Sequence, residues 1–339
     1  MTSNPADLAL GMPEAELLVR AVHPTARVTG LDLRTGGRLS TVYEVRCADP
    51  AHSVIVKSYQ EQWRWKQRKE VHVYRLLAAV PGWPAPAVLH ATPAGPGGRA
   101  ATVLSLLPGR ELSAAGGPDG AGIASIYRQL GSSLAALHRT VLPAFGYLTT
   151  EILDPAPDNA SYMARQFDRK LAEFAELGGA PELHRAIRAR IAGQETLFAT
   201  CRAPVLCHND LHEGNMLVAP VAEGPGVGVG AGAGAGEVQG AGRSWRLTGL
   251  VDVENAIAAD PLMDLAKLEQ YAVRGDAAKR AALLSGYGPL PADAEARLAL
   301  YQLYFSLELW AWFASVGELD PLPGLADDLA RLADPGAGH

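Results

Sequence analysis

The stretch Val205–Val218 constrains this chain more than any other part of the sequence. Short apolar runs at its two ends enclose eight mostly polar residues, a pattern that is typical of strands entering and leaving a loop. Within that loop Asp210 precedes Asn215 by five positions. A carboxylate and a carboxamide at this spacing suit phosphoryl transfer, in which the aspartate accepts a hydroxyl proton and the asparagine oxygen holds Mg²⁺ against the phosphates.

The octapeptide His208–Asn215, His-Asn-Asp-Leu-His-Glu-Gly-Asn, resembles the catalytic loop of the aminoglycoside phosphotransferase and choline kinase superfamily. These enzymes are small-molecule relatives of the protein kinases, whose catalytic loops share the His-x-Asp-x-x-x-x-Asn spacing. The resemblance implies that Asp210 is the catalytic residue, that Asn215 is a metal ligand and that His208 supports the loop.

The first half of the chain predicts a sheet that covers a nucleotide. Residues 28–34 and 41–46 alternate in the manner of strands and are joined by a turn that contains Gly36 and Gly37. Such a turn can lay backbone N–H groups over phosphates, with Ser40 and Thr41 as further donors. An ordinary hairpin turn is the alternative interpretation.

A buried ion pair is predicted between the next strand and the helix that follows it. Residues 53–59 form a β-branched strand that carries Lys57, and the apolar stripe of the helix over residues 66–80 includes the position of Glu70. A carboxylate on an inward face is costly unless it is paired, and Lys57 is its natural partner. The resemblance implies that this lysine binds the α- and β-phosphates.

Residues 81–96 are rich in proline and predict turns, and residues 101–107 predict an apolar strand that Pro108 and Gly109 end. In the family the corresponding strand leads to a hinge whose backbone binds the purine. The resemblance therefore implies a nucleotide-binding lobe over residues 1–104, a hinge over residues 105–110 with contacts at Ser105 and Leu107, and a catalytic lobe over residues 111–339.

A second metal ligand is predicted at Asp252, at the end of the strand over residues 245–252. Thirty-seven positions separate it from Asn215, which is more than the family spacing, and a Gly/Ala-rich insertion over residues 219–242 accounts for the excess. We expect this low-complexity segment to be flexible. Glu254 contacts the metal or the substrate, or it forms a structural salt bridge.

The segment Asp260-Pro261-Leu-Met-Asp264-Leu-Ala resembles a further motif of the family. Asp260 suits a helix N-cap, and Asp264 is placed to accept hydrogen bonds from the catalytic loop, so both are predicted to be structural supports. The helix over residues 293–316 is apolar almost all round. In it, Trp310 and Trp312 either form an aromatic box for a cationic acceptor or pack in the core.

Composition excludes several other classes of protein. A net charge of −6 argues against a general nucleic-acid binder, and there is no apolar run of about 18 residues to span a membrane. The N-terminus lacks the pattern of a secretory signal, and 3 cysteines without metal-type spacing favour a reduced, cytoplasmic enzyme. No Gly-x-Ser-x-Gly motif of a serine hydrolase is present.

Together the resemblance implies an α+β, bilobal, protein-kinase-like fold: an antiparallel sheet plus helix, followed by a mostly helical lobe. It implies a kinase that uses ATP or GTP with Mg²⁺ to phosphorylate a hydroxyl group of a small molecule. The acidic C-terminal part of the chain favours a cationic acceptor such as an aminoglycoside or another aminated antibiotic, as in resistance or self-protection. A choline or ethanolamine kinase and a nucleotide-binding pseudokinase are the alternatives. A zinc or iron cluster of His208, Asp210 and His212 is a weaker one, because it leaves the lysine–glutamate pair unexplained.

Overall fold

The computed structural model describes residues 10–36, 40–48, 51–114, 116–221 and 244–334. The chain divides into two compact units, each built from three separate stretches of sequence. The first unit comprises Met1–Ala136, Glu213–Glu254 and Ala277–Gly288, and the second comprises Leu137–His212, Asn255–Asp276 and Pro289–His339.

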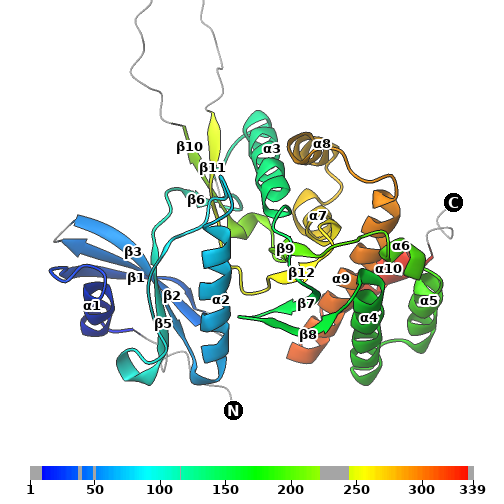
Figure 1. Ribbon diagram of the computed structural model, residues 1–339, viewed down its shortest axis with the longest axis horizontal. Helices are drawn as coiled ribbons and strands as arrows, with labels where there is room; N and C mark the ends of the chain where they lie inside the picture. The colour runs from blue at the N-terminus through cyan, green and yellow to red at the C-terminus, as the bar shows by residue number, and fades with distance from the viewer. Residues whose placement is uncertain (1–9, 37–39, 49–50, 115, 222–243, 335–339) are drawn as a thin grey trace, which may run out of the picture. The chain divides into compact units, whose positions relative to one another are not determined.

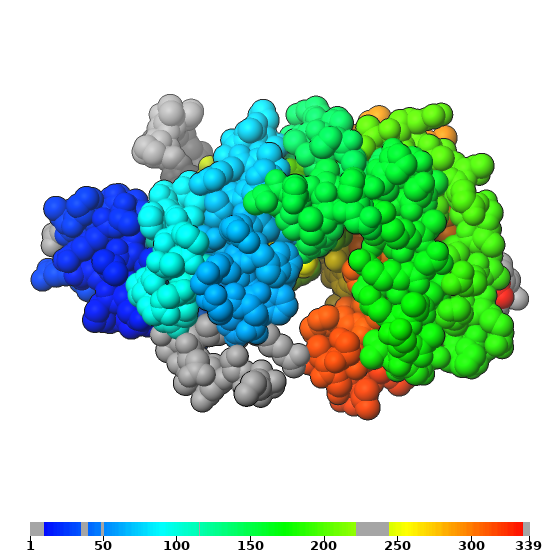
Figure 2. All heavy atoms as spheres, turned by 60° about the horizontal axis from the view of Figure 1, so that its bottom comes forward, coloured from blue at the N-terminus to red at the C-terminus, as the bar shows by residue number. Residues whose placement is uncertain are grey.

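A five-stranded antiparallel sheet with the order β1-β2-β3-β5-β4 dominates the first unit (Figure 1). Its strands are β1 (Val28–Gly36), β2 (Ser40–Ala48), β3 (Ala51–Tyr59), β4 (Val88–Thr92) and β5 (Ala100–Ser105). Two helices contact it, α1 (Met12–Arg20) and α2 (Arg64–Leu77), and short 3-10 turns cover Glu61–Trp63 and Pro96–Gly98. Figure 2 shows the light-blue atoms of α2 against the cyan atoms of the β4–β5 region, which α2 contacts.

The alternation of β3 gives its two faces different roles. Val54 and Val56 pack into an apolar core with strands β1, β2 and β5 and helix α1. Ile55 and Lys57 point to the other face, where they line a cavity. The β-branched residues of this strand favour the extended backbone, so the same short run builds the core and carries a charged group to the opposite side.

Further elements of the first unit hold the segments around Asn215 and Asp252. A three-stranded sheet has the order β11-β10-β6, and it consists of β6 (Arg110–Glu111), β10 (Met216–Pro220) and β11 (Trp245–Leu250). A 3-10 turn, η4 (Glu213–Asn215), precedes β10, and two helices, α3 (Gly120–Leu137) and α8 (Ala277–Tyr287), complete the unit. The two helices approach so closely that a side chain at Gly286 would collide with the backbone of Arg128.

The second unit combines a four-stranded antiparallel sheet, with the order β8-β7-β12-β9, with most of the remaining helices. Its strands are β7 (Phe145–Leu148), β8 (Ile152–Ala156), β9 (Val205–Cys207) and β12 (Ile257–Ala259). Its helices are α4 (Asn159–Glu176), α5 (Pro181–Ile191), α6 (Glu195–Phe198), α7 (Leu262–Leu268), the π-helix η5 (Glu269–Val273), α9 (Ala294–Val316) and α10 (Leu322–Ala333).

The predicted α+β class is confirmed, including the antiparallel sheet near the N-terminus and the abundance of helices in the later part of the chain. The compact units do not follow the predicted lobes, because β6, α3, η4, β10, β11 and α8 pack with the first unit. The division into a nucleotide-binding lobe, hinge and catalytic lobe at residues 104, 105–110 and 111 is a functional one and stays a prediction.

Two predicted features lie partly outside the described residues. The structure does not describe residues 37–39 of the turn between β1 and β2, or residues 222–242 of the predicted insertion. Within the described ranges, no helix has both the length and the apolar character that a membrane crossing requires.

Candidate active site

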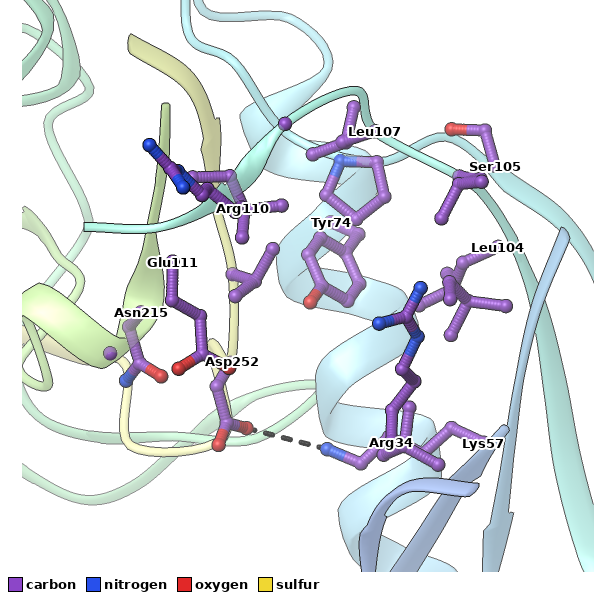
Figure 3. Close-up of a pocket in the computed structure, with 18 of the residues that line it drawn as sticks. Arg34, Lys57, Tyr74, Leu104, Ser105, Leu107, Arg110, Glu111, Asn215 and Asp252 are labelled. Carbon is purple, nitrogen blue, oxygen red and sulfur yellow. Dashed lines mark hydrogen bonds and ion pairs between the residues drawn. The ribbon is translucent and has the colours of Figure 1, made fainter. Parts of the chain in front are cut away.

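A cavity of about 710 Å³ opens in the first unit, and half of the predicted site residues line it (Figure 3). The predicted residues among those that line it are Ser40, Lys57, Ser105, Leu107, Asn215, Asp252 and Glu254. They come from β2, β3, the end of β5 and the residues after it, η4 and the segment after β11. A volume of this size falls in the range of small-molecule and cofactor sites.

The predicted lysine–glutamate pair is confirmed. The Lys57 ammonium nitrogen lies 2.9 Å from Glu70 Oε1 and 3.0 Å from Glu70 Oε2, and the Tyr59 hydroxyl donates to the same carboxylate at 3.1 Å. Glu70 is 1% exposed and Lys57 is 8% exposed. Burial raises the pKa of Glu70, and the adjacent Lys57 ammonium opposes that effect.

Lys57 also contacts the predicted metal ligand Asp252, with its ammonium nitrogen 3.3 Å from Oδ1, as the dashed line in Figure 3 marks. Burial by itself would lower the pKa of Lys57, but the carboxylates of Glu70 and Asp252 raise it well above its usual value. The lysine is therefore a permanently charged cation that faces the cavity, where it can neutralise the oxygens of a bound phosphate chain.

Asp252 and Asn215 supply oxygen ligands on the same side of the cavity (Figure 3). The carbonyl oxygen of Asn215 accepts a hydrogen bond of 3.0 Å from the Val251 N–H, so the two segments are tied together directly beside both side chains. Asp252 has a left-handed backbone with φ of 63°, which is uncommon for a residue other than glycine and is typical of functional positions.

The donor set fits Mg²⁺. A carboxylate and a carboxamide oxygen that line one cavity are the hard ligands that this ion prefers. Carboxylate oxygens of Glu70, Asp252 and Glu254 also lie within 4.8 Å of one another, a concentration of negative charge that a cation would relieve. Glu70, however, is committed to Lys57.

The apolar end of the cavity is formed around the end of β5. Leu104, Ser105, Leu106 and Leu107 line it. Ser105 is anchored to the neighbouring chain, because its N–H donates to the Ala87 carbonyl and its hydroxyl accepts from the Ala87 N–H, each at 2.9 Å. A planar apolar ligand group would fit beside these leucines.

Strand alternation separates the two predicted phosphate donors on β2. Ser40 and Val42 line the cavity, whereas Thr41, which is only 5% exposed, lies between them and points to the opposite face of the strand. Within the part of the chain that the structure describes, Thr41 is not among the residues that line the cavity.

In the second unit, Asp264 binds the backbone of the loop that carries Asp210. Asp264 accepts the His208 N–H at 2.9 Å and the Asn209 N–H at 2.7 Å, and it also contacts the His138 ring at 3.1 Å. These hydrogen bonds help to lower the pKa of the Asp264 carboxyl despite its burial. Asp264 therefore accepts hydrogen bonds from the loop backbone, as the sequence predicted.

The side chain of Asp210 is oriented by Asn255, whose amide nitrogen donates to Asp210 Oδ2 at 3.0 Å. An ionised carboxylate can only accept hydrogen bonds, so the amide nitrogen must face it. Asn255 is in turn oriented by Asn209, whose amide donates to the Asn255 carbonyl at 3.1 Å. Asn209 has φ of 59°, so strain is present directly beside Asp210.

Asp260 is a fully buried support at the start of α7. Its carboxylate accepts the Leu262 N–H at 2.9 Å and the Tyr301 hydroxyl at 2.7 Å, and it pairs with Arg297. Asp260 thus precedes the N-cap residue Pro261, accepts from the first residue of α7 and fastens that helix to α9. These contacts agree with a structural role.

The remaining predicted residues are placed as follows. Trp310 is 7% exposed and packs on Phe174 with ring centroids 4.3 Å apart, which is the core-packing alternative, and Trp312 is 52% exposed. Glu254 forms a salt bridge of 3.2 Å with Lys66. Among the described residues, the groups placed to share a metal do not include the set His208, Asp210 and His212.

Sequence reasoning missed residues with three different contacts: Arg34, Tyr74, Arg110 and Glu111 line the cavity, Asn255 orients Asp210, and Lys66 pairs with Glu254. Lys66 had a usable signal, because it lies one helical turn before Glu70 and so shares its inward face. The others depend on register and on loops that periodicity does not describe.

One of the buried groups of α2 predicts a measurable pH dependence. Lys69 is fully buried, and burial, with repulsion from Lys66, lowers its pKa to about 7. Between about pH 7 and pH 10 the unfolded chain therefore binds a proton that the folded chain does not. Stability rises with pH across this window, by up to about 1.4 kcal/mol per pH unit from this group.

The variant Lys69→Met is expected to be more stable than the wild type near neutral pH and to lack this rise. Urea unfolding at about pH 7 and about pH 9 gives the change in the free energy of unfolding with pH for each protein. The difference between the wild type and Lys69→Met in this change is the contribution of Lys69. Lys170→Met, which removes a lysine paired with Glu173 on α4, is the control. An unchanged slope in Lys69→Met would show that the ammonium is charged throughout.

Comparison with known proteins agrees with the geometry. A sequence profile of the phosphotransferase enzyme family matches residues 31–229, whereas no curated protein sequence matches the chain. Among solved structures, aminoglycoside phosphotransferase APH(4)-Ia is 14% identical with a TM-score of 0.67, and the match covers 97% of this chain and 100% of that one.

Two structures with bound ligands are also similar to the chain. A thermostable mutant of APH(4)-Ia in a ternary complex with ADP and hygromycin B has 16% identity and a TM-score of 0.65, and the match covers 96% of this chain and 99% of that chain. The streptomycin–ATP–APH(2″)-IIa ternary complex has 15% identity and a TM-score of 0.60, with the same coverage of 96% and 99%. At these identities the likeness shows a shared fold. The family match spans more than half of the sequence, and the chain therefore belongs to the phosphotransferase enzyme family.

Proposed function

We propose that this protein transfers the γ-phosphoryl group of ATP or GTP to a hydroxyl group of an aminated small molecule, with Mg²⁺ as cofactor. The observation that supports this most strongly is the convergence of Lys57, Asp252 and Asn215 on one cavity. A lysine, a carboxylate and a carboxamide are the groups that kinases use to hold a metal-bound triphosphate.

Each residue has a separate task in this proposal. Lys57, held by Glu70, neutralises the α- and β-phosphates, and Asn215 and Asp252 hold the metal. Bound Mg²⁺ would neutralise charge that develops on the phosphates. Asp210 orients the acceptor hydroxyl and takes its proton, while Ser40 donates to phosphate oxygens. The purine would lie along residues 105–110, against Ser105 and Leu107.

The acceptor is proposed to be an aminoglycoside or a related aminated antibiotic. Residues 251–339 contain 14 Asp and Glu residues against 6 Lys and Arg residues, and this excess of acidic groups attracts cations. Structurally similar enzymes form complexes with hygromycin B and streptomycin. We further propose a role in antibiotic resistance in the cytoplasm, where nucleoside triphosphates are available and where the free Cys47, Cys201 and Cys207 would stay reduced.

A coupled assay with Mg·ATP or Mg·GTP tests the proposal against a panel of aminoglycosides, nucleoside antibiotics, choline, ethanolamine and homoserine. Turnover with an aminated antibiotic is the expected result. Turnover confined to choline or ethanolamine would assign the protein to the alternative kinase class. Tight nucleotide binding without transfer to any acceptor would identify a pseudokinase.

Asp252→Asn tests the metal site separately from turnover. This variant is expected to bind Mg·ADP at least about 10-fold more weakly. Its affinity for metal-free ADP should not fall, because a negative charge beside the phosphates has been removed. Titration calorimetry with and without a chelator measures both values. Asp32→Asn, which makes the same charge change at an exposed position of β1, is the control, and equal losses in both variants would contradict the assignment.

A further inference from the structure

Lys66 and Glu254 form a second enclosed ion pair beside the proposed metal site. The Lys66 ammonium nitrogen lies 3.2 Å from Glu254 Oε1, and the two side chains are only 11% and 16% exposed. The same nitrogen lies 5.5 Å from the centroid of the Trp63 ring and 5.8 Å from that of the Trp65 ring, within cation–π range. Two indole rings therefore help to shield this pair from water.

The distance between Lys66 and Glu70 along α2 is similar to the distance that can separate Asp252 from Glu254. Lys66 and Glu70 are four residues apart on α2, which corresponds to a rise of about 6 Å along the helix. Asp252 and Glu254 are two residues apart, and two extended residues span at most about 7 Å. One turn of α2 can thus contact both acidic residues at once, Asp252 through the Lys57–Glu70 pair and Glu254 through Lys66.

Asp252 needs contacts on both sides to keep its conformation. Its left-handed backbone, with φ of 63°, is strained for a residue with a side chain and persists only where the surroundings hold it. On the N-terminal side, the Val251 N–H is bound to the Asn215 carbonyl. On the C-terminal side, Val253 is fully buried, and the next residue, Glu254, is held by its ion pair with Lys66.

We propose that Lys66 and Glu254 are positioning residues, which fix the backbone after Asp252 so that its carboxylate faces the metal. Trp63 and Trp65 strengthen the pair by limiting the access of water. This inference rests on the proposed function, because it assumes that Asp252 binds Mg²⁺. It assigns the Glu254 carboxylate to Lys66 rather than to the metal or the acceptor.

Binding of ADP, measured by titration calorimetry with Mg²⁺ and with a chelator, tests the inference without any acceptor or turnover. Lys66→Met is expected to weaken Mg·ADP binding by about 10–100-fold, the usual effect of losing a group that orients a metal ligand. Metal-free ADP binding should change no more than in Arg64→Met. That control removes a partly exposed cation, paired with Glu61, from the same turn of α2. Lys66→Arg, which keeps the charge, should recover most of the affinity.

A double-variant cycle identifies the partner. If Glu254 acts through Lys66, then Glu254→Gln and Lys66→Met each weaken Mg·ADP binding, and the double variant loses clearly less than the product of the two effects. A loss in Glu254→Gln with none in Lys66→Met would instead make Glu254 a metal ligand and overturn the inference. Equal losses for Mg·ADP and metal-free ADP in Lys66→Met would also overturn it.

Urea unfolding checks that each variant is folded. If Lys66→Met does not fold because Glu254 is left buried without its partner, the neutral double variant replaces it in the comparison. Wild-type affinity for Mg·ADP in the folded double variant would overturn the inference while leaving the proposed function intact. A wild type that binds ADP equally well with and without Mg²⁺ would contradict the proposed function itself, and this inference with it.

Discussion

Replacement of Asp210 by asparagine is expected to lower the turnover number by about 10²–10⁴-fold, the range that a general base contributes. Affinity for Mg·ADP should stay within about twofold, because in the proposed mechanism Asp210 handles the acceptor hydroxyl and not the nucleotide. The amide oxygen of the new side chain can still accept the hydrogen bond from Asn255 that Asp210 accepts at 3.0 Å. The substitution therefore removes the proton acceptor while the loop keeps its supports.

Initial rates with the best acceptor of the panel and calorimetric titration with Mg·ADP measure the two effects. Asp168→Asn is the matched control, since this residue is exposed on α4 and pairs only loosely with Arg188, at 3.3 Å. It should keep the wild-type turnover number. Turnover near the wild-type value in Asp210→Asn would mean that another group accepts the proton.

The second large effect is on stability. Lys57→Met is expected to lower the free energy of unfolding by about 3–5 kcal/mol, because it leaves the carboxylate of Glu70 buried without its cation. Glu70 is 1% exposed, and the Tyr59 hydroxyl, at 3.1 Å, cannot replace a charge. Urea unfolding at neutral pH measures the loss, and the midpoint should move without a change in the slope m.

Two further variants separate the loss of the ion pair from the loss of packing. Adding Glu70→Gln to Lys57→Met removes the unpaired charge, so the double variant should regain part of the stability. Arg331→Met, which breaks an exposed pair with Asp328, should cost less than about 1 kcal/mol. A loss in Lys57→Met as small as in Arg331→Met would show that the pair contributes little to folding.

Lys57, Glu70 and Asp252 illustrate what could be predicted before the structure. The sequence predicts the role of Glu70 because a carboxylate on the inward face of a helix needs a partner, and Lys57 is the nearest suitable cation on the preceding strand. It predicts Asp252 from its place at the end of a strand and from its order after Asn215. The structure places the three side chains together, although they are up to 195 positions apart in the chain.

Asn255, Lys66 and Arg34 illustrate what could not. Asn255 directly follows the acidic segment and looks like an ordinary turn residue, yet it orients Asp210. Whether Lys66 contacts Glu254 depends on how α2 lies against residues 252–254. Arg34 lines the cavity from an irregularity in the pairing of β1 with β2, next to the buried Glu44 with which it pairs. Strand β4, at the edge of the five-stranded sheet, lies in a proline-rich stretch that predicts turns. It forms because it pairs with β5, and not because of its own β-propensity.

The sequence by itself determined the strand that carries Lys57, the helix that carries Glu70, the polar groups on the loop around Asp210 and the need for a buried ion pair, because these follow from local periodicity and from the cost of burying charge. Only the tertiary structure decided which side chains share the cavity, which face of β2 meets it, which neighbour orients Asp210 and which contacts surround the strained backbone of Asp252. Those contacts join residues far apart in the chain, and their geometry arises only when strands take their register and helices pack.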